Sequence, residues 1–256
     1  MKTSKKHKYT TEGILYAIVM SSFLFAIIYV PLRAALDESY RENTEYKIMI
    51  FQTLFGIIVV NLPSFLTKRF AWRIPRVFSI IFMLFLWGAI FAGEVWEFYY
   101  RIPFWDDALH FISSMMAAML GFSLIDILNS DKKHNTVSLS PFFVAIFSIA
   151  FAVFIGVLWE IYEYTFDGIL GLNMQKFATE SNGGREILTE LGGRAALEDT
   201  MTDLIVDTLG ALLVSTVGYV SLKLNKGWLG TFKVEISKSE NNVQDNKDSL
   251  TNKRKE

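Results

Sequence analysis

The stretch that decides the fold is Thr136–Trp159, TVSLSPFFVAIFSIAFAVFIGVLW, which contains no charged residue. A helix needs roughly 20 largely apolar residues to cross a hydrocarbon core about 30 Å thick. Four further uncharged runs are Gly13–Val30, Ile48–Thr67, Val77–Gly93 and Ala108–Ile125, the last with one histidine, and a sixth run, Leu204–Leu222, is interrupted only by Asp207. One such run could be a buried core helix of a soluble protein, but six in one short chain argue against that class. The sequence therefore predicts an all-α integral membrane protein, a six-helix transmembrane bundle.

Composition agrees with this class and excludes several kinds of site. Of 256 residues, 52% are hydrophobic and 15% aromatic, the mean hydropathy is +0.31, and the net charge of −1 indicates no nucleic-acid partner. The chain has no cysteine, so a disulfide framework and a thiolate metal site are both excluded. Of its three histidines, His7 and His134 fall in a tail and a loop. Three-histidine zinc chemistry would require both of them to leave those segments.

The distribution of basic residues predicts the orientation in the membrane. Lysine and arginine are retained on the cytoplasmic side. They gather before the first span, between the second and third, between the fourth and fifth, and after the sixth. Both termini are therefore expected inside (N-in/C-in) in a multi-pass membrane protein. We interpret the first span as an uncleaved anchor rather than a signal peptide, because its apolar run is long and no convincing cleavage site follows.

The expected organisation is one membrane domain with two polar ends. Residues 1–12 form a basic cytoplasmic N-terminus, and residues 13–224 form the six-helix domain, with an external loop at about 166–198. That loop is long enough to be a lid but could equally be a simple connector. Residues 225–256 are polar and lack apolar periodicity, so a disordered cytoplasmic tail is expected.

Acidic side chains gather at one expected depth on four different spans. The residues are Glu94 and Glu97 at the end of the third, Asp106, Asp107 and His110 at the start of the fourth, Glu160 and Glu163 at the end of the fifth, and Asp199, Asp203 and Asp207 at the start of the sixth. Because the third and fifth spans run outward and the fourth and sixth inward, all four segments reach the extracytoplasmic side. An ionised carboxylate in the membrane costs about 2.5–3.5 kcal/mol even on the lenient insertion scale. We therefore expect Asp203, Asp207 and Glu160 to face the bundle interior, near His110.

Each of these residues also has an ordinary structural explanation. Glu94 and Glu97, which are expected one helical turn apart, could touch solvated headgroups. Asp199 could be an anion favoured in the first turn of a helix by the helix dipole. His110 alone would be a satisfied core histidine. Asp203 and Asp207 lie too far into the helix for capping, so they favour a functional polar site.

At these positions the sequence resembles the YjdF-type bacterial inner-membrane proteins, a family without an assigned activity, and is more distantly similar to VanZ-like proteins. The matching pieces are Trp105-Asp106-x-x-x-His110, Glu160-x-x-Glu163-Tyr164, and Asp199-Thr200-x-x-Asp203 continuing to Gly210-Ala211. Their order agrees with the family from about Trp72 to Leu222. VanZ-like proteins usually have lysine where Asp107 stands and asparagine where Asp207 stands. These two departures make the present site more acidic, and the resemblance implies a shared site without implying its activity.

The first functional hypothesis is a metal-dependent hydrolase or transferase at the outer leaflet. Carboxylates with one imidazole suit Mg²⁺, Mn²⁺ or Zn²⁺. The predicted metal ligands are His110, Glu160, Asp199 and Asp203. The predicted catalytic residues are Glu163, as general base, and Asp106, which could also orient His110 or bind the metal. The polar site further includes Glu97, Asp107 and Asp207. The expected substrate is a lipid or a lipid-linked envelope precursor, and the expected partners are membrane lipids.

Two other classes of function stay open at this stage. The carboxylates could serve a cation- or proton-coupled binding or transport protein, or the chain could be a non-enzymatic envelope accessory protein. Against the enzyme, the signatures of the CDP-alcohol phosphotransferases and of the type-2 phosphatidate phosphatases are absent. Against transport, the acids reach only part of the way across. Metal analysis of the purified protein separates these classes.

Overall fold

The computed structural model describes residues 10–42, 45–70, 72–129, 139–181, 184–187, 193–228 and 234–236. Within these ranges, six helices are long and apolar enough to cross a membrane, which confirms the predicted all-α six-helix bundle. They comprise α1 (Thr11–Leu36), α3 and α4 (Glu45–Val60 and Leu62–Phe70), α5 and η1 (Arg76–Leu86 and Trp87–Val95), α7 (Trp105–Asn129), α8 (Pro141–Leu170) and α9 (Ala195–Lys223). Two short helices, α2 (Glu38–Glu42) and α6 (Phe98–Arg101), lie between spans.

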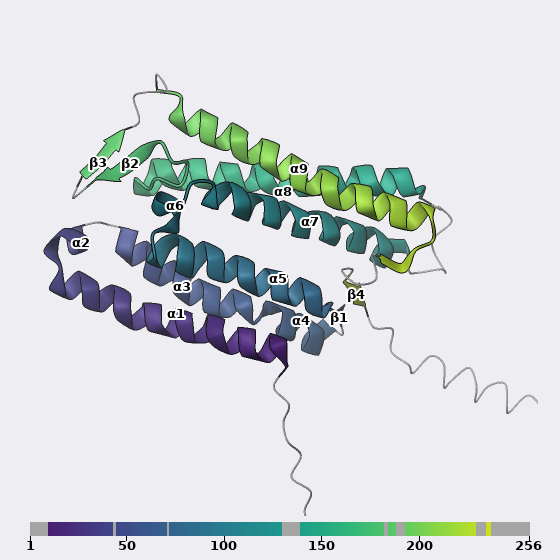
Figure 1. Ribbon diagram of the computed structural model, residues 1–256, viewed down its shortest axis with the longest axis horizontal. Helices are drawn as coiled ribbons and strands as arrows, with labels where there is room; N and C mark the ends of the chain where they lie inside the picture. The colour runs from purple at the N-terminus through teal and green to yellow at the C-terminus, as the bar shows by residue number, and fades with distance from the viewer. Residues whose placement is uncertain are drawn as a thin grey trace, which may run out of the picture.

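The helices pack as two groups with separate apolar cores (Figure 1). One core is formed where α1, α3, α5 and η1 meet, and it includes the fully buried Val19 and Phe23. The other is formed by α7, α8 and α9, and it includes Ala118 and Phe122. Helix α5 joins the groups, because Phe78 belongs to the second core while other residues of α5 belong to the first. The acidic segments of α7, α8 and α9 therefore fall within a single three-helix unit.

Glycines bring α7, α8 and α9 into close contact. A Cβ atom on Gly210 of α9 would lie 2.6 Å from the carbonyl oxygen of Phe111, and one on Gly121 of α7 would lie 2.9 Å from the Cα of Ser148. Small residues allow membrane helices to approach backbone to backbone in this way. At such short separations, aspartate and histidine side chains from different helices reach one another.

Helix α8 has clear sequence signals at both ends. Ser140 caps its start, where the hydroxyl accepts a hydrogen bond from the amide of Phe143 at 3.2 Å, and Pro141 occupies the first turn. The helix continues past the apolar run to Leu170 and ends at Gly171, whose φ of 67° suits glycine. Glu160 and Glu163 therefore lie well inside the helix rather than at its boundary.

The end of the third span differs from the sequence expectation. Residues Trp87–Val95 are π-helical, and the amide of Trp96 donates to the carbonyl of Phe91, five residues earlier. Glu97 follows in a left-handed conformation with φ of 59°. Glu94 and Glu97 therefore do not share the regular helical turn that we expected. In this conformation the ring of Trp96 lies on that of Phe91, with ring centroids 4.9 Å apart.

Two pairs of short antiparallel strands lie at opposite ends of the bundle. At the end that holds the start of α9, which we call the site end, β2 (Ala178–Ser181) pairs with β3 (Gly184–Ile187). This hairpin belongs to the expected external loop, of which residues 182–183 and 188–192 lie outside the described residues. At the far end, β1 (Trp72–Arg73) pairs with β4 (Glu235–Ile236).

Part of the chain beyond the sixth span is packed against the bundle. The amide of Val234 donates a hydrogen bond of 2.9 Å to the buried hydroxyl of Ser123 on α7. Residues 234–236 belong to the tail that we expected to be disordered, but this short segment is bound to the bundle. Residues 229–233 and 237–256 of that tail, and residues 1–9 of the expected N-terminal segment, lie outside the described residues.

Candidate functional site

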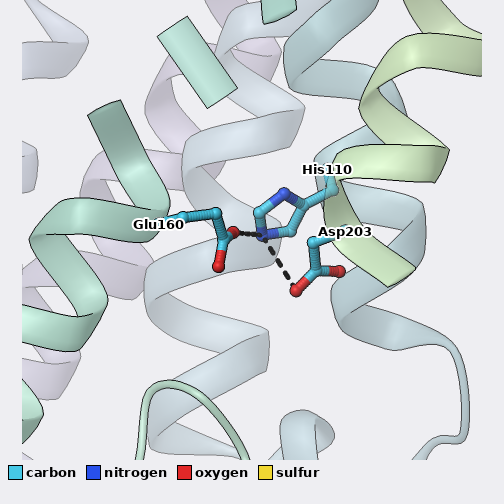
Figure 2. Close-up of side chains that lie close together, drawn as sticks. All are labelled: His110, Glu160 and Asp203. Carbon is cyan, nitrogen blue, oxygen red and sulfur yellow. Dashed lines mark ion pairs between the residues drawn. The ribbon is translucent and has the colours of Figure 1, made fainter. Parts of the chain in front are cut away.

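The centre of the site is a buried histidine between two carboxylates (Figure 2). His110 of α7 lies 4.0 Å from Glu160 of α8 and 3.8 Å from Asp203 of α9, both distances measured from its Nε2 to a carboxylate oxygen. One ligand atom from each of the three residues falls within 4.8 Å of the others. All three side chains are buried, at 6%, 5% and 1% exposure. We call this set the inner group.

Asp207 lies near the other nitrogen of the same imidazole. Its Oδ1 lies 3.5 Å from His110 Nδ1, one helical turn along α9 from Asp203. Gly156 on α8 makes room for this carboxylate, because a Cβ there would lie 2.1 Å from Asp207 Oδ2. In metal sites, a ligating histidine characteristically donates its second ring N–H to a carboxylate, which fixes the orientation of the ring. The arrangement of Asp207, His110 and the inner group has that form.

A second acidic set adjoins the first and shares one of its members. Asp106 of α7 and Asp199 of α9 offer ligand atoms within 4.8 Å of one another and of Asp203. We call Asp106, Asp199 and Asp203 the outer group. The predicted ligand set of His110, Glu160, Asp199 and Asp203 is therefore divided between two neighbouring positions, and Asp203 belongs to both.

Many of the carboxylate oxygens in this site are buried without a hydrogen-bond partner in the described part of the chain. They are both oxygens of Glu160 and one each of Asp106, Glu163, Asp199, Asp203 and Asp207. Four of these oxygens, one each on Asp106, Glu160, Asp203 and Asp207, lie 3.5–4.0 Å from a nitrogen of His110 or Lys176. The other three, on Glu160, Glu163 and Asp199, have neither a hydrogen bond nor an ion pair in the described part of the chain. A buried charge that is neither paired nor hydrogen-bonded is strongly unfavourable. The site therefore requires protons or cations to compensate these oxygens.

The other predicted site residues occupy different positions. Glu163 is buried one turn beyond Glu160, and the indole Nε1 of Trp159 donates to its Oε1 at 2.9 Å. Glu97 lies apart, paired with Arg33 at 3.5 Å and with Arg101. Among the described residues, neither group that could hold a metal includes Glu163, Glu97 or the half-buried Asp107.

A folded loop at the site end supplies residues that the sequence did not indicate. We call residues 171–178 the cap loop. Asp167 at the end of α8 accepts hydrogen bonds from the amides of Met174 and Gln175 at 2.8 and 2.9 Å. Asn173 bonds both the amide and the carbonyl of Ala178, at 2.9 and 2.7 Å. These bonds give the cap loop a defined shape next to the acidic residues.

Lys176 is the cation that the cap loop presents to the site. Its Nζ lies 3.6 Å from Asp106 Oδ2 and 4.5 Å from the centroid of the Tyr99 ring. Burial lowers the pKa of Lys176, but the surrounding carboxylates, Asp106 first, outweigh this effect and raise the pKa above 10.5. The ammonium therefore stays charged. The sequence alone does not indicate this role for Lys176, because a loop residue has no periodicity that places it.

The donor set suits several hard or borderline divalent cations. Carboxylate oxygens alone favour Mg²⁺ or Mn²⁺, and an added imidazole also suits Zn²⁺. The inner group offers one nitrogen and two carboxylates, and the outer group offers three carboxylates. The buried group of His110, Glu160 and Asp203 could thus hold a metal ion.

Comparison with known proteins assigns the chain to a family. The profile of the family described as "Predicted membrane protein (DUF2238)" matches residues 14–224, so the chain belongs to this family. An uncharacterized protein of Thermotoga maritima is 31% identical over 127 residues, which cover 50% of this chain and 54% of that protein. The chain thus matches about half the length of that relative. No solved structure matches the chain. The resemblance to VanZ-like proteins stays a prediction.

Proposed function

We propose that this member of the DUF2238 family is a divalent-metal-dependent hydrolase or transferase that acts on a lipid or lipid-linked envelope substrate at the outer face of the bacterial cytoplasmic membrane. One observation carries the proposal. His110, Glu160 and Asp203 converge from three helices to within 4.8 Å, and both oxygens of Glu160 have no hydrogen-bond partner in the described structure. This arrangement supports a metal centre more than a structural network in which every buried polar atom is hydrogen-bonded.

The roles of the individual residues follow from their contacts. His110, Glu160 and Asp203 bind the ion, and Asp207 orients the His110 ring through Nδ1. A bound divalent ion would polarise a phosphoryl or acyl oxygen and lower the pKa of a water molecule. Glu163 is the general base that takes a proton from water or another nucleophile. Trp159 holds one of its oxygens, and the second is buried without a hydrogen-bond partner in the described structure.

A groove beside the site supports a membrane-borne substrate. It has a volume of about 460 Å³ and is lined by Tyr164, Ile169 and their neighbours on α8 and by Gln175 and Phe177 of the cap loop. Tyr164 is 70% exposed, so the groove opens at a helix surface of the kind that faces lipid. Gln175, one of the lining residues, donates a hydrogen bond of 2.9 Å to Thr200, one turn from Asp203 on α9. The groove is therefore linked to the helix that carries Asp203, and we propose it as the place where a lipid headgroup approaches.

The packing beyond the site supports an enzyme over a transport protein. On the side of the inner group toward the far end, the core of α7, α8 and α9 is occupied by apolar residues such as Met119 and Phe122. The buried hydroxyls of Ser123 and Ser148 donate to carbonyls of their own helices, at 2.8 and 2.9 Å. Ser215 of α9 has a buried hydroxyl without a hydrogen-bond partner in the described structure, but the hydroxyls of Ser123 and Ser148 are turned to their own helices. Within the described residues these side chains therefore support a packed core more than a polar path.

The orientation is part of the proposal and can be tested directly. Because the natural chain has no cysteine, each single-cysteine variant carries one reactive thiol. We expect a membrane-impermeant maleimide to label Glu38→Cys from outside whole cells and Lys68→Cys only after the membrane is opened. The reverse pattern would place the site on the cytoplasmic side.

The central experiment measures metal in the purified full-length protein. We expect the wild type and Asp107→Asn to retain bound Mn²⁺ or Zn²⁺ through gel filtration, whereas His110→Ala and Asp203→Asn lose it while keeping a monodisperse elution profile. Asp107→Asn is the matched control, because Asp107 belongs to neither group. Binding that is equal in all four proteins, or undetectable in the folded wild type at millimolar metal, would refute a metal centre at these residues.

A further inference from the structure

We propose that the site holds two divalent cations, the second bound by the outer group of Asp106, Asp199 and Asp203, with Asp203 bridging the two positions. This inference rests on the proposed function, because it places a second ion beside the first. It adds a second metal position, the ligands of that position and a lysine that competes with the second ion. If the inference is wrong, the proposal for the inner position is not affected.

The geometry repeats along two helices. Asp106 precedes His110 by four residues on α7, and Asp199 precedes Asp203 by four residues on α9. Four residues advance a helix by about 6 Å, so each pair presents ligands on one face at two successive levels. The inner group takes the deeper member of each pair, and the outer group takes the shallower members together with Asp203. Two adjacent cation positions follow from this stagger.

Buried oxygens without a hydrogen bond occur at the outer position as well as at the inner one. They are one oxygen each of Asp106, Asp199 and Asp203 in the described structure. The oxygen of Asp106 faces Lys176 and that of Asp203 faces His110, whereas that of Asp199 has neither a hydrogen bond nor an ion pair there. Asp203 itself is 1% exposed, and its Oδ2 lies 3.8 Å from His110. A carboxylate with two oxygens can bind a different ion with each of them, and this is the usual link in two-metal sites, where the ions lie about 3.5–4 Å apart.

The balance of charge also favours a second cation. The cluster contains six carboxylates, those of Asp106, Glu160, Glu163, Asp199, Asp203 and Asp207. In the described part of the chain, only His110 and Lys176 form ion pairs with these carboxylates. One divalent ion leaves most of the remaining negative charge uncompensated in a buried site, and two reduce it further.

Lys176 is the internal competitor for the outer position. Its ammonium lies 3.6 Å from Asp106 Oδ2, where it partly neutralises the outer group. It comes from the cap loop rather than from a membrane helix, so it can withdraw without repacking the bundle. The outer ion is therefore bound more weakly than the inner ion, and removing the lysine charge strengthens it.

The test uses the full-length protein in detergent with Mn²⁺ as the probe, read by equilibrium dialysis and by electron paramagnetic resonance. We expect the wild type to saturate at two Mn²⁺ per chain, with the multi-line spectrum of an exchange-coupled pair. Asp106→Asn should weaken the second binding event by about tenfold or more and leave an uncoupled single-ion spectrum. Asp107→Asn, an identical change at the adjacent residue, should behave as the wild type.

Three further outcomes separate this inference from the proposed function. Saturation at one uncoupled Mn²⁺ per chain overturns the outer position and leaves the inner centre standing. Absence of any binding overturns both. Lys176→Met changes a loop residue and no residue of a membrane helix. It should tighten the second binding event by about tenfold, so it tests the outer position even if Asp106→Asn fails to fold. If the affinity for the second Mn²⁺ is unchanged in Lys176→Met, Lys176 does not compete with the outer ion.

Discussion

Gly156 makes room for the carboxylate that orients His110, and its replacement by alanine tests the geometry of the site directly. In Gly156→Ala, the new Cβ would lie 2.1 Å from Asp207 Oδ2 and 3.1 Å from its Cγ, whereas ordinary contact begins at 3.4 Å. The carboxylate must therefore move by roughly 1.3 Å. Asp207 is 1% exposed and faces His110 at 3.5 Å, so no free space accepts this movement.

The expected cost is that of an overpacked core. Inserting a methyl group into a well-packed interior destabilises proteins by about 1–3 kcal/mol. In a chain of this size, each kcal/mol corresponds to about 2–4 °C in melting temperature. The matched control is Gly168→Ala on the same helix, where a Cβ meets nothing within 4 Å. There we expect a gain of about 0.5–1 kcal/mol, because alanine loses less backbone entropy than glycine in a helix.

The assay is thermal unfolding of purified variants in one detergent, followed by tryptophan fluorescence, together with Mn²⁺ binding. Gly156→Ala should melt below the wild type and bind Mn²⁺ more weakly, and Gly168→Ala should melt at or above it. Combining Gly156→Ala with Asp207→Ala should cost less than the sum of the single changes, because the second removes the atoms that clash. Equal melting temperatures for the two alanine variants, or full additivity in the double variant, would show that Gly156 and Asp207 do not touch.

Two other predictions concern the cap loop. Asn173→Ala removes both hydrogen bonds to Ala178, so we expect the loop to loosen by about 1–3 kcal/mol and to be cut faster by a protease than in the wild type; an unchanged cleavage rate contradicts this. Lys176→Met should remove a pH-dependent contribution to the stability of the folded protein. The pKa of Lys176 is raised above 10.5 in the folded state. The stabilisation by its charge is therefore fully present below pH 10.5 and is lost as the pH rises through the raised pKa. The difference in melting temperature between wild type and Lys176→Met should therefore shrink only above pH 10.5, and a difference that is constant from pH 8 to 12 would refute the ion pair with Asp106.

The six spans were predictable because the cost of charge in hydrocarbon acts locally on each run of residues. The fifth span illustrates this, since its uncharged run identified α8 directly, and Ser140 and Pro141 then mark where the helix starts. The aspartates of the sixth span were also predictable as a stripe, because a spacing of four residues repeats on one helix face. That this stripe meets His110 and Glu160 followed from the alternating direction of the spans.

The remaining features depend on contacts between segments that have no common pattern in the sequence. Lys176 reaches Asp106 only because Asp167 and Asn173 bind backbone groups of the cap loop, and no periodicity signals such bonds. Glu97 was misplaced because a regular helix was assumed up to that residue. The division of the acids into two groups with Asp203 in common requires distances between helices, which one sequence does not contain.

The π-helical segment η1 also affects how this protein tolerates changes in length. Deleting one residue from an α-helical span turns everything that follows by about 100°, which would move lipid-facing side chains into the interior. A π-helical turn already accommodates one extra residue, so a deletion between Trp87 and Val95 could be absorbed by a return to α-helical geometry. Related proteins that differ in length within a membrane helix should therefore carry their insertions and deletions in this segment of the third span.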